Sequence, residues 1–204
     1  MEGVPFLIES TTAGPISRLA EEIESIAQKG FGDRSFVQAC APALRRLLSE
    51  KDFLPEGAKE PSEKGYARHL LYSDPEGRFC ITAMVWTPGQ GTPIHDHDGS
   101  WGMIGMVEGS LEVVNFHADG EKPGVGEVSL RKEEPHVPTA GADECVCGCA
   151  DIHAVQNRFA ETAISVHIYA RDIEKCLVFE EIPGGENRYM VREKALAYSS
   201  DSSI

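Results

Sequence analysis

Two stretches near the start of the chain alternate apolar and charged positions with the period of a helix. Residues 15–29 place apolar side chains at spacings of three and four, with acidic residues between them, which predicts an amphipathic helix. A second helical stretch runs from about residue 35 to residue 50, and Pro42 inside it predicts a break or a restart. Residues 52–65 contain two prolines and two glycines, which indicates a connecting loop.

From Tyr66 onward the pattern changes to short apolar or alternating runs separated by Gly, Pro and Asp, which indicates a series of β-strands. Residues 74–77 and 183–186 have the composition of hairpin turns. Many short strands with frequent turns predict a mainly β sandwich or barrel that follows a short helical segment. The predicted strands are 66–72, 79–87, 92–97, 101–107, 110–117, 126–132, 144–147, 152–157, 162–169, 176–182 and 187–192.

Length and charge narrow the class of protein. With 204 residues, of which 41% are hydrophobic, the chain can bury one sizeable core. We therefore expect one structural domain, with residues 1–60 as a helical segment packed on a barrel of residues 61–204. The net charge of -14 argues against sequence-independent nucleic-acid binding, which depends on Lys and Arg.

The chain also lacks the sequence signals of export and membrane insertion. Its start has an acid where a signal peptide needs bases, and no apolar run approaches a membrane span, so we expect a cytoplasmic protein. The six cysteines are too sparse and irregular for a disulfide framework, which favours free thiols. Cys145, Cys147 and Cys149 are interpreted as buried or half-buried strand residues, with a metal or redox role as the alternative.

The candidate chemistry centres on His95 and His97, within a glycine-rich stretch from Gly89 to Gly109. In a strand, residues two apart point to the same face, so both imidazoles could reach one ion. Imidazole suits Zn, Cu, Fe and Ni, so the spacing alone names no metal. Since two histidines rarely hold a functional metal, a third ligand is needed, and His153 in a later strand is the best candidate.

These spacings resemble a known fold family. The glycines and histidines of residues 89–109 follow the first cupin motif, and His153 with Asn157 follows the end of the second. The resemblance implies a cupin double-stranded β-helix, or jelly-roll, barrel. The usual glutamate ligand is replaced by Gly102, which leaves three histidines.

Within the cupins, the chain is similar to the cysteine dioxygenase family of thiol dioxygenases over about residues 65–192. That resemblance implies Fe(II) held by three histidines, with a small thiol and O2 as substrates. Ser165, His167 and Tyr169 match the family's relay. Tyr66 and Arg68 match its Tyr-x-Arg, whose arginine holds the substrate carboxylate, and Cys176 matches a cysteine near the pocket.

Two departures leave the substrate open. Many animal members carry a cysteine at the position of Gly102 that forms a thioether with the relay tyrosine, and here that crosslink cannot form. The segment that contains Trp101 and Met103 resembles mercaptopropionate dioxygenases; these two side chains would narrow the pocket if they face the iron, and otherwise belong to the core. Some of those enzymes place an arginine after the relay tyrosine, as Arg171 is placed here.

The leading hypothesis is therefore oxidation of a small carboxylate-bearing thiol to a sulfinic acid, with L-cysteine first, 3-mercaptopropionate second and mercaptosuccinate third. The diacid would fit if Arg68 and Arg171 converged on the pocket. A cupin isomerase with another metal, or a cupin that only binds a ligand or metal, are alternatives of other classes, because a fold does not fix a function. The resemblance also favours a monomer.

Overall fold

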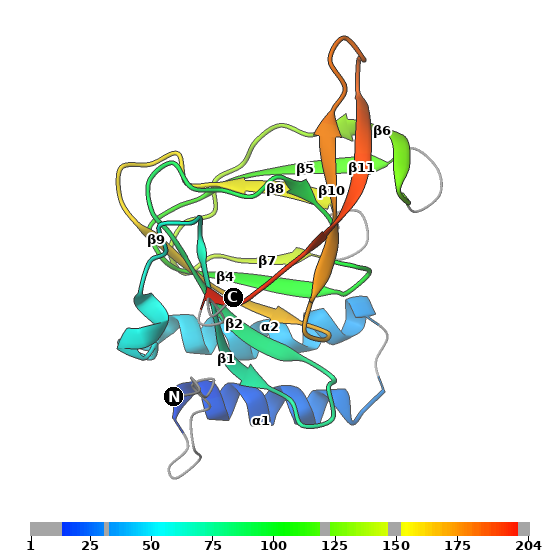
Figure 1. The fold of residues 1–204 in the computed structure, drawn as a ribbon. Coiled ribbons are helices and arrows are strands. Elements are labelled where there is room, and N and C mark those ends of the chain that lie inside the picture. Colours follow the sequence, from blue (N-terminus) through cyan, green and yellow to red (C-terminus); the bar gives the residue numbers. More distant parts are fainter. Residues whose placement is uncertain (1–13, 31–32, 119–122, 147–151, 200–204) are drawn as a thin grey trace, which may run out of the picture.

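The computed structural model describes residues 14–30, 33–118, 123–146 and 152–199, and it places two helices before a series of strands (Figure 1). The helical elements are α1 (Pro15–Ala27), α2 (Asp33–Ser49) and the 3-10 helix η1 (Glu56–Lys59). The strands are β1 (Ala67–Ser73), β2 (Cys80–Trp86), β3 (Ile94–His95), β4 (Gly102–Glu108), β5 (Glu112–Ala118), β6 (Gly126–Lys132), β7 (Asp143–Val146), β8 (Ile152–Gln156), β9 (Ala163–Tyr169), β10 (Lys175–Glu181) and β11 (Arg188–Ala195). Among the described helices, none combines the length and the hydropathy that a membrane span requires.

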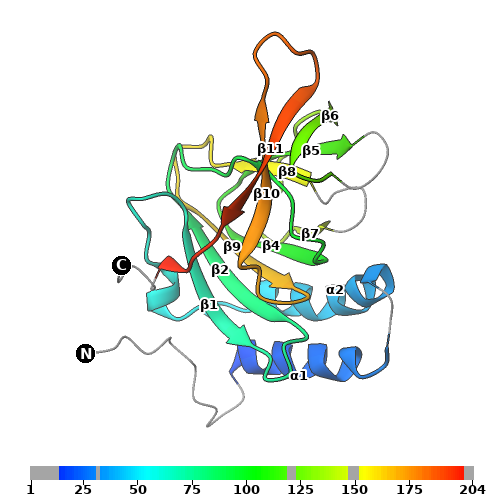
Figure 2. The same cartoon turned by 45° about the vertical axis from the view of Figure 1, so that its right-hand side comes forward.

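The strands form two antiparallel sets. One is a five-stranded sheet in the order β1-β2-β9-β4-β7, and the other closes on itself in the order β10-β11-β6-β5-β8-β3. The two helices cover one face of the five-stranded sheet, and the β10–β11 hairpin extends at the opposite end of the molecule (Figure 2). This mainly β barrel with a helical start confirms the predicted cupin fold class, and every predicted strand has a counterpart.

Both predicted hairpins are present. The turn at residues 74–77 joins β1 to β2 and the turn at residues 183–186 joins β10 to β11, each pair being antiparallel. Gly77 and Gly184 adopt φ of 69° and 75°, a conformation that glycine reaches without the steric cost of a Cβ atom. The turn chemistry thus sets where these strands reverse.

The prediction about Pro42 is wrong, because α2 continues through it from Asp33 to Ser49. A proline inside a helix costs about 3 kcal/mol. The apolar face of α2 offsets this cost, because Leu44 and Leu47 are fully or almost fully buried, and burial of such a side chain contributes about 1.5–3 kcal/mol.

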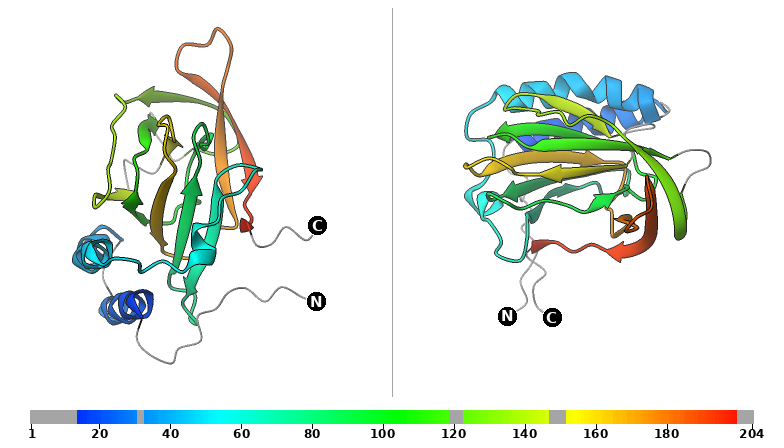
Figure 3. Two further views of the ribbon diagram at one scale, coloured as in Figure 1. Left: turned by 90° about the vertical axis from the view of Figure 1, so that its left-hand side faces the viewer. Right: turned by 90° about the horizontal axis from the view of Figure 1, so that it is seen from above.

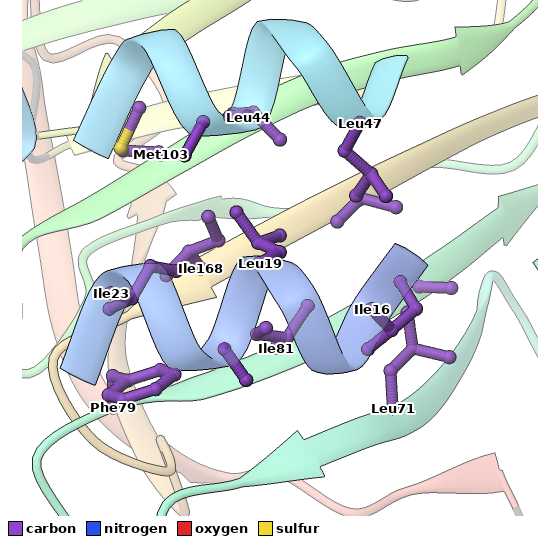
Figure 4. Packing of buried hydrophobic residues seen from close by; sticks show 14 of the residues in the cluster. Ile16, Leu19, Ile23, Leu44, Leu47, Leu71, Phe79, Ile81, Met103 and Ile168 are labelled. Carbon is purple, nitrogen blue, oxygen red and sulfur yellow. The ribbon is translucent and has the colours of Figure 1, made fainter. Parts of the chain in front are cut away.

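The central strands β2 and β9 of the five-stranded sheet are buried on both faces. In β2 every residue is buried: Ile81, Ala83 and Val85 pack toward the helices, whereas Met84 and Trp86 belong to a second cluster on the inner side. Figure 4 shows Ile81 beside α1, and the left view of Figure 3 shows both helices end-on at one side of the sheet. The outer face therefore anchors the helices, and the inner face is left to form the site.

Candidate functional site

Three histidines from the closed set of strands meet on its inner side. His95 in β3 pairs with His153 in β8, and His97 follows two residues after His95. Their ring centroids lie 5.1 Å apart for His95 and His97, 4.8 Å for His95 and His153, and 4.7 Å for His97 and His153. One nitrogen from each ring lies within 4.8 Å of the others, so the structure brings the three predicted metal ligands together.

The surroundings keep the imidazoles of His95 and His153 uncharged. Burial, followed by repulsion from His97, lowers the pKa of His95 to about 3, and burial also holds the pKa of His153 well below its usual value. The Nδ1 atom of His95 donates to the carbonyl oxygen of Pro93 at 3.1 Å, which leaves Nε2 as a lone-pair donor. Neutral imidazoles gathered in a buried site are suitable ligands for a divalent transition metal.

A hydrogen-bonded chain of side chains crosses from the inner face of β2 to the inner face of β9. The indole Nε1 of Trp86 donates to Ser165 Oγ at 3.0 Å, Ser165 Oγ lies 2.7 Å from His167 Nε2, and His167 Nδ1 lies 2.8 Å from the Tyr169 hydroxyl. The Tyr169 ring stacks beside His97 with centroids 5.8 Å apart. The relay therefore ends at the histidine cluster.

Burial fixes the protonation states in this relay. It lowers the pKa of His167 to about 3 and raises the pKa of Tyr169 far above its ordinary value. At neutral pH the imidazole is therefore neutral and the phenol keeps its proton. Trp86 was not predicted as a site residue, although a tryptophan in a strand needs a partner for its indole N–H and so gave a usable signal.

A cavity separates the histidine cluster from β1. Arg68 lines it, is only 5% exposed, and donates from Nη2 to Asp172 Oδ1 at 3.0 Å. Tyr66 stacks on Trp86 with ring centroids 4.4 Å apart. Arginine, histidine and tyrosine groups thus converge on one cavity. Its lining comprises Tyr66, Arg68, Met84, Trp86, Thr92, Pro93, His95, Asp96, His97, His153, Val155, His167, Tyr169, Ile173, Cys176, Lys194 and Leu196.

The sequence model of the family described as "Cysteine dioxygenase type I" matches residues 60–182, which is more than half of the chain and includes the histidine cluster and the relay. The chain belongs to this family. Family membership makes the protein an oxidoreductase of the thiol dioxygenase class.

Individual relatives agree with the family match. Human cysteine dioxygenase type 1 is 26% identical over 171 residues, which cover 83% of this chain and 82% of the human protein. Cysteine dioxygenase type 1 of Rattus norvegicus is 26% identical over 126 residues, 60% of each chain. Among solved structures, the protein TT1209 from Thermus thermophilus has a TM-score of 0.43 and 19% identity, covering 57% of this chain and 92% of its own. A cupin 2 conserved barrel domain protein from Salinispora arenicola has a TM-score of 0.40 and 16% identity, covering 57% and 84%.

The inner face of β4 explains why the relay tyrosine has room. Gly102 pairs with Tyr169, and a Cβ atom at Gly102 would lie 2.8 Å from Tyr169 Cδ1. Position 102 therefore faces the tyrosine ring, as the resemblance implied, and glycine offers no side chain for a crosslink there.

Trp101 and Met103 lie on the other side of β4, not in the cavity. Both belong to the core cluster beneath the helices, and the Trp101 ring lies 4.6 Å from the ring of Phe36 in α2. Because side chains alternate along a strand, the neighbours of Gly102 must point away from Tyr169. Of the two alternatives, the structure therefore supports the core, and the expected role of Trp101 and Met103 in substrate binding is corrected.

Arg171 also lies outside the cavity lining. Its side chain is 51% exposed, and its Nη2 donates to the Asp98 carbonyl oxygen at 2.5 Å and to Asp98 Oδ2 at 3.1 Å. The strand β9 ends at Tyr169, so the alternation that places Tyr169 inward does not extend to Arg171. The predicted convergence of Arg68 and Arg171 is not found. A different cation, the exposed Lys194, lines the cavity instead.

The structure describes only some of the cysteines that the sequence analysis singled out. Cys176 lines the cavity, where burial raises its pKa to about 11. Cys145 belongs to β7 and pairs with Met103, whereas Cys147 and Cys149 lie outside the described residues. The interpretation of this cysteine-rich segment therefore stays a prediction.

Proposed function

We propose that the protein is an Fe(II)-dependent thiol dioxygenase that converts the thiol of a small carboxylate-bearing substrate to a sulfinic acid with O2. The observation that carries this proposal is the cavity in which three clustered histidines face both a buried arginine and a tyrosine relay. L-cysteine is the preferred candidate substrate, with 3-mercaptopropionate and mercaptosuccinate as alternatives within the same reaction class.

The three histidines would hold the iron. Neutral ligands leave the 2+ charge of the ion undiminished, and a bound Fe(II) would deprotonate a coordinated thiol and offer positions for the thiol and O2. Family membership supports iron over the other metals that imidazole accepts. Asp96 contributes indirectly, since its Oδ1 accepts from the backbone N–H of Leu177 at 2.7 Å and so ties the histidine segment to β10.

Arg68 would bind the substrate carboxylate. Its guanidinium is planar and permanently charged, with five N–H donors in a fixed fork. Among the described residues its side-chain hydrogen bond is to Asp172 through Nη2, so other N–H groups are available to a carboxylate. A thiol anchored in this way would present its sulfur to the histidine cluster across the cavity.

Tyr169 would hold a proton near the reacting atoms. In the arrangement we favour, Trp86 donates to Ser165, the Ser165 hydroxyl donates to His167 Nε2, and His167 Nδ1–H donates to the Tyr169 oxygen. The phenolic hydrogen is then free to point at substrate or oxygen beside His97. Because burial raises the pKa of Tyr169, the phenol would donate this hydrogen bond without losing its proton.

The position of Arg171 weakens the case for a diacid. The charge argument for mercaptosuccinate required two arginines in the cavity, and Arg171 is instead paired with Asp98. Lys194 is the remaining candidate for a second carboxylate, and it is exposed. This distribution of charge supports a monocarboxylate such as L-cysteine ahead of mercaptosuccinate.

Oxygen uptake tests this proposal. The protein is loaded anaerobically with Fe(II) and given L-cysteine, 3-mercaptopropionate or mercaptosuccinate at equal concentrations, with a chelator-treated sample as control. We expect thiol-dependent uptake, sulfinate by mass spectrometry, and the highest rate with L-cysteine. Absence of uptake with all three thiols in a protein that has retained its iron would contradict the proposal.

A further inference from the structure

Arg68 is held from two directions by residues that follow the relay strand in the chain. The Tyr198 ring lies over its guanidinium, 4.2 Å from the arginine Cζ to the ring centroid. Asp172 Oδ1 accepts from Arg68 Nη2 at 3.0 Å and from the Tyr198 hydroxyl at 2.6 Å. The three side chains therefore form a closed triangle in which each contacts the other two.

The C-terminal segment that carries Tyr198 is fixed next to β1. The backbone N–H of Arg68 donates to Ser199 Oγ at 2.8 Å, and the backbone N–H of Leu196 donates to the Glu174 carbonyl oxygen at 2.8 Å. Leu196 lines the cavity. This segment lies beyond residues 60–182, over which the family model matches, so the family motifs assign it no role.

We propose that Tyr198 and Asp172 form a clamp that positions Arg68 for the substrate carboxylate and sets the charge that Arg68 presents to it. This inference rests on the proposed function. Tyr198 and Asp172 are positioning residues, because they act through Arg68.

Tyr198 orients the guanidinium of Arg68. An unrestrained arginine would lose its rotamer freedom when it bound a carboxylate, which weakens binding. Stacking on an aromatic face is attractive in itself and confines the guanidinium to one plane before the substrate arrives. Burial raises the pKa of Tyr198, and the hydrogen bond to Asp172 acts in the same direction, so the hydroxyl stays protonated and keeps donating to the carboxylate.

Asp172 sets the selectivity between thiols with one carboxylate and thiols with two. Arg68 is 5% exposed on its side chain and Asp172 is 40% exposed, so the carboxylate offsets part of the charge of a buried guanidinium. The remaining positive charge suits one substrate carboxylate better than two. Removing the charge of Asp172 without changing its shape should therefore favour dianionic thiols.

Anaerobic calorimetry and steady-state oxygen uptake test the clamp. The Fe(II)-loaded wild-type protein is compared with Tyr198→Leu, Tyr198→Phe and Asp172→Asn, using 3-mercaptopropionate, mercaptosuccinate and the carboxylate-free ethanethiol. Tyr72→Phe is the matched control, because Tyr72 also donates to a carboxylate, that of Glu24 at 2.6 Å, on the helical side of β1.

We expect Tyr198→Leu to raise both the Kd and the KM for 3-mercaptopropionate about tenfold, while kcat changes by less than about twofold. Tyr198→Phe keeps the ring and should raise the Kd only about twofold to threefold, the size of one lost hydrogen bond. Asp172→Asn should increase the preference for mercaptosuccinate over 3-mercaptopropionate several-fold. The Kd for ethanethiol should be the same in all variants, and Tyr72→Phe should bind all three thiols as the wild-type protein does.

An unchanged Kd for 3-mercaptopropionate in Tyr198→Leu would overturn the clamp. An equal increase in the Kd values for 3-mercaptopropionate and for ethanethiol would also overturn the clamp, because that pattern indicates a general structural role for Tyr198. Failure of the proposed function looks different: the wild-type protein itself would then take up no oxygen with any of the thiols.

Discussion

The two faces of the five-stranded sheet are made by the same strands but differ in chemistry, because only the inner face carries a chain of buried polar side chains. Toward the helices, β2 and β9 present Ile81, Val85, Val166 and Ile168, which pack in one apolar cluster. Toward the cavity, the intervening positions of β9 are buried polar groups, and Ser165, His167 and Tyr169 are linked by hydrogen bonds. One face can therefore be changed mainly at the expense of stability and the other mainly at the expense of activity.

The difference follows from what burial costs each kind of group. Apolar side chains gain about 25 cal/mol for each Å² removed from water and need only a close-packed partner. A buried hydroxyl or imidazole costs free energy unless every partner is in place. On the inner face, a substitution is therefore tolerated only if the hydrogen bonds are kept. On the outer face, it is tolerated if the side-chain volume is kept.

The largest effect is expected from His153→Ala. Loss of a residue that binds the metal directly should reduce metal affinity and activity by more than loss of a residue that hydrogen-bonds to a metal ligand. The latter loss costs about 10-fold to 100-fold in metal affinity or activity. Iron content and thiol-dependent oxygen uptake should both fall by more than this, with circular dichroism unchanged. A variant that retained iron and normal activity would exclude His153 as a ligand.

Tyr169→Phe tests the end of the relay. The variant keeps the ring beside His97 and loses the hydroxyl, so activity should fall about 100-fold, the lower range for a positioned proton donor. Loss of a partner for His167 should lower the free energy of unfolding by about 1–3 kcal/mol. Steady-state oxygen uptake and urea denaturation measure the two quantities. Activity close to that of the wild type would show that the phenolic proton is not used.

Two substitutions within β2 compare the faces directly. Ile81→Ala, on the outer face, should lower the free energy of unfolding by about 2–5 kcal/mol and leave kcat per folded molecule unchanged. Trp86→Phe, on the inner face, removes the donor to Ser165 and should lower kcat about tenfold with a smaller loss of stability. Reversal of these two patterns would refute the assignment of stability to one face and activity to the other.

The smallest expected effect is a loss of folding stability at acidic pH. The pKa of His167 is about 3 in the folded protein because of burial, against an ordinary value near 6.5 for an exposed histidine. Only the unfolded chain takes up a proton there as the pH falls below 6.5, so stability is highest above that pH and declines toward pH 3. Urea denaturation of the metal-free protein between pH 7.5 and 5 should show this decline; a flat profile would contradict the burial of a neutral imidazole.

Local periodicity made much of the fold and part of the site predictable. Strand alternation placed Ser165, His167 and Tyr169 on one face and His95 beside His97, and the glycine-containing turns marked both hairpins. These predictions depend on neighbours in sequence, which a period of two residues or a turn motif describes. The same alternation favours the core alternative for Trp101 and Met103, because both are direct neighbours of Gly102, which faces Tyr169.

Contacts between distant segments could not be predicted. The bond from Arg68 to Asp172 joins residues 104 positions apart, and that from Arg68 to Ser199 joins residues 131 positions apart. Their meeting depends on how the chain turns after β9 and β11 and has no local pattern. The same turn after β9 carries Arg171 to the surface, although the resemblance to mercaptopropionate dioxygenases had suggested a place for it in the pocket.

The origin of the oxygen atoms in the product tests the central claim most directly. The Fe(II)-loaded protein is given L-cysteine under 18O2 in ordinary water, and the product is examined by mass spectrometry. A thiol dioxygenase should yield cysteine sulfinate with both sulfinate oxygens labelled. Formation of cystine alone, or of a sulfinate whose oxygens derive from water, would contradict the account.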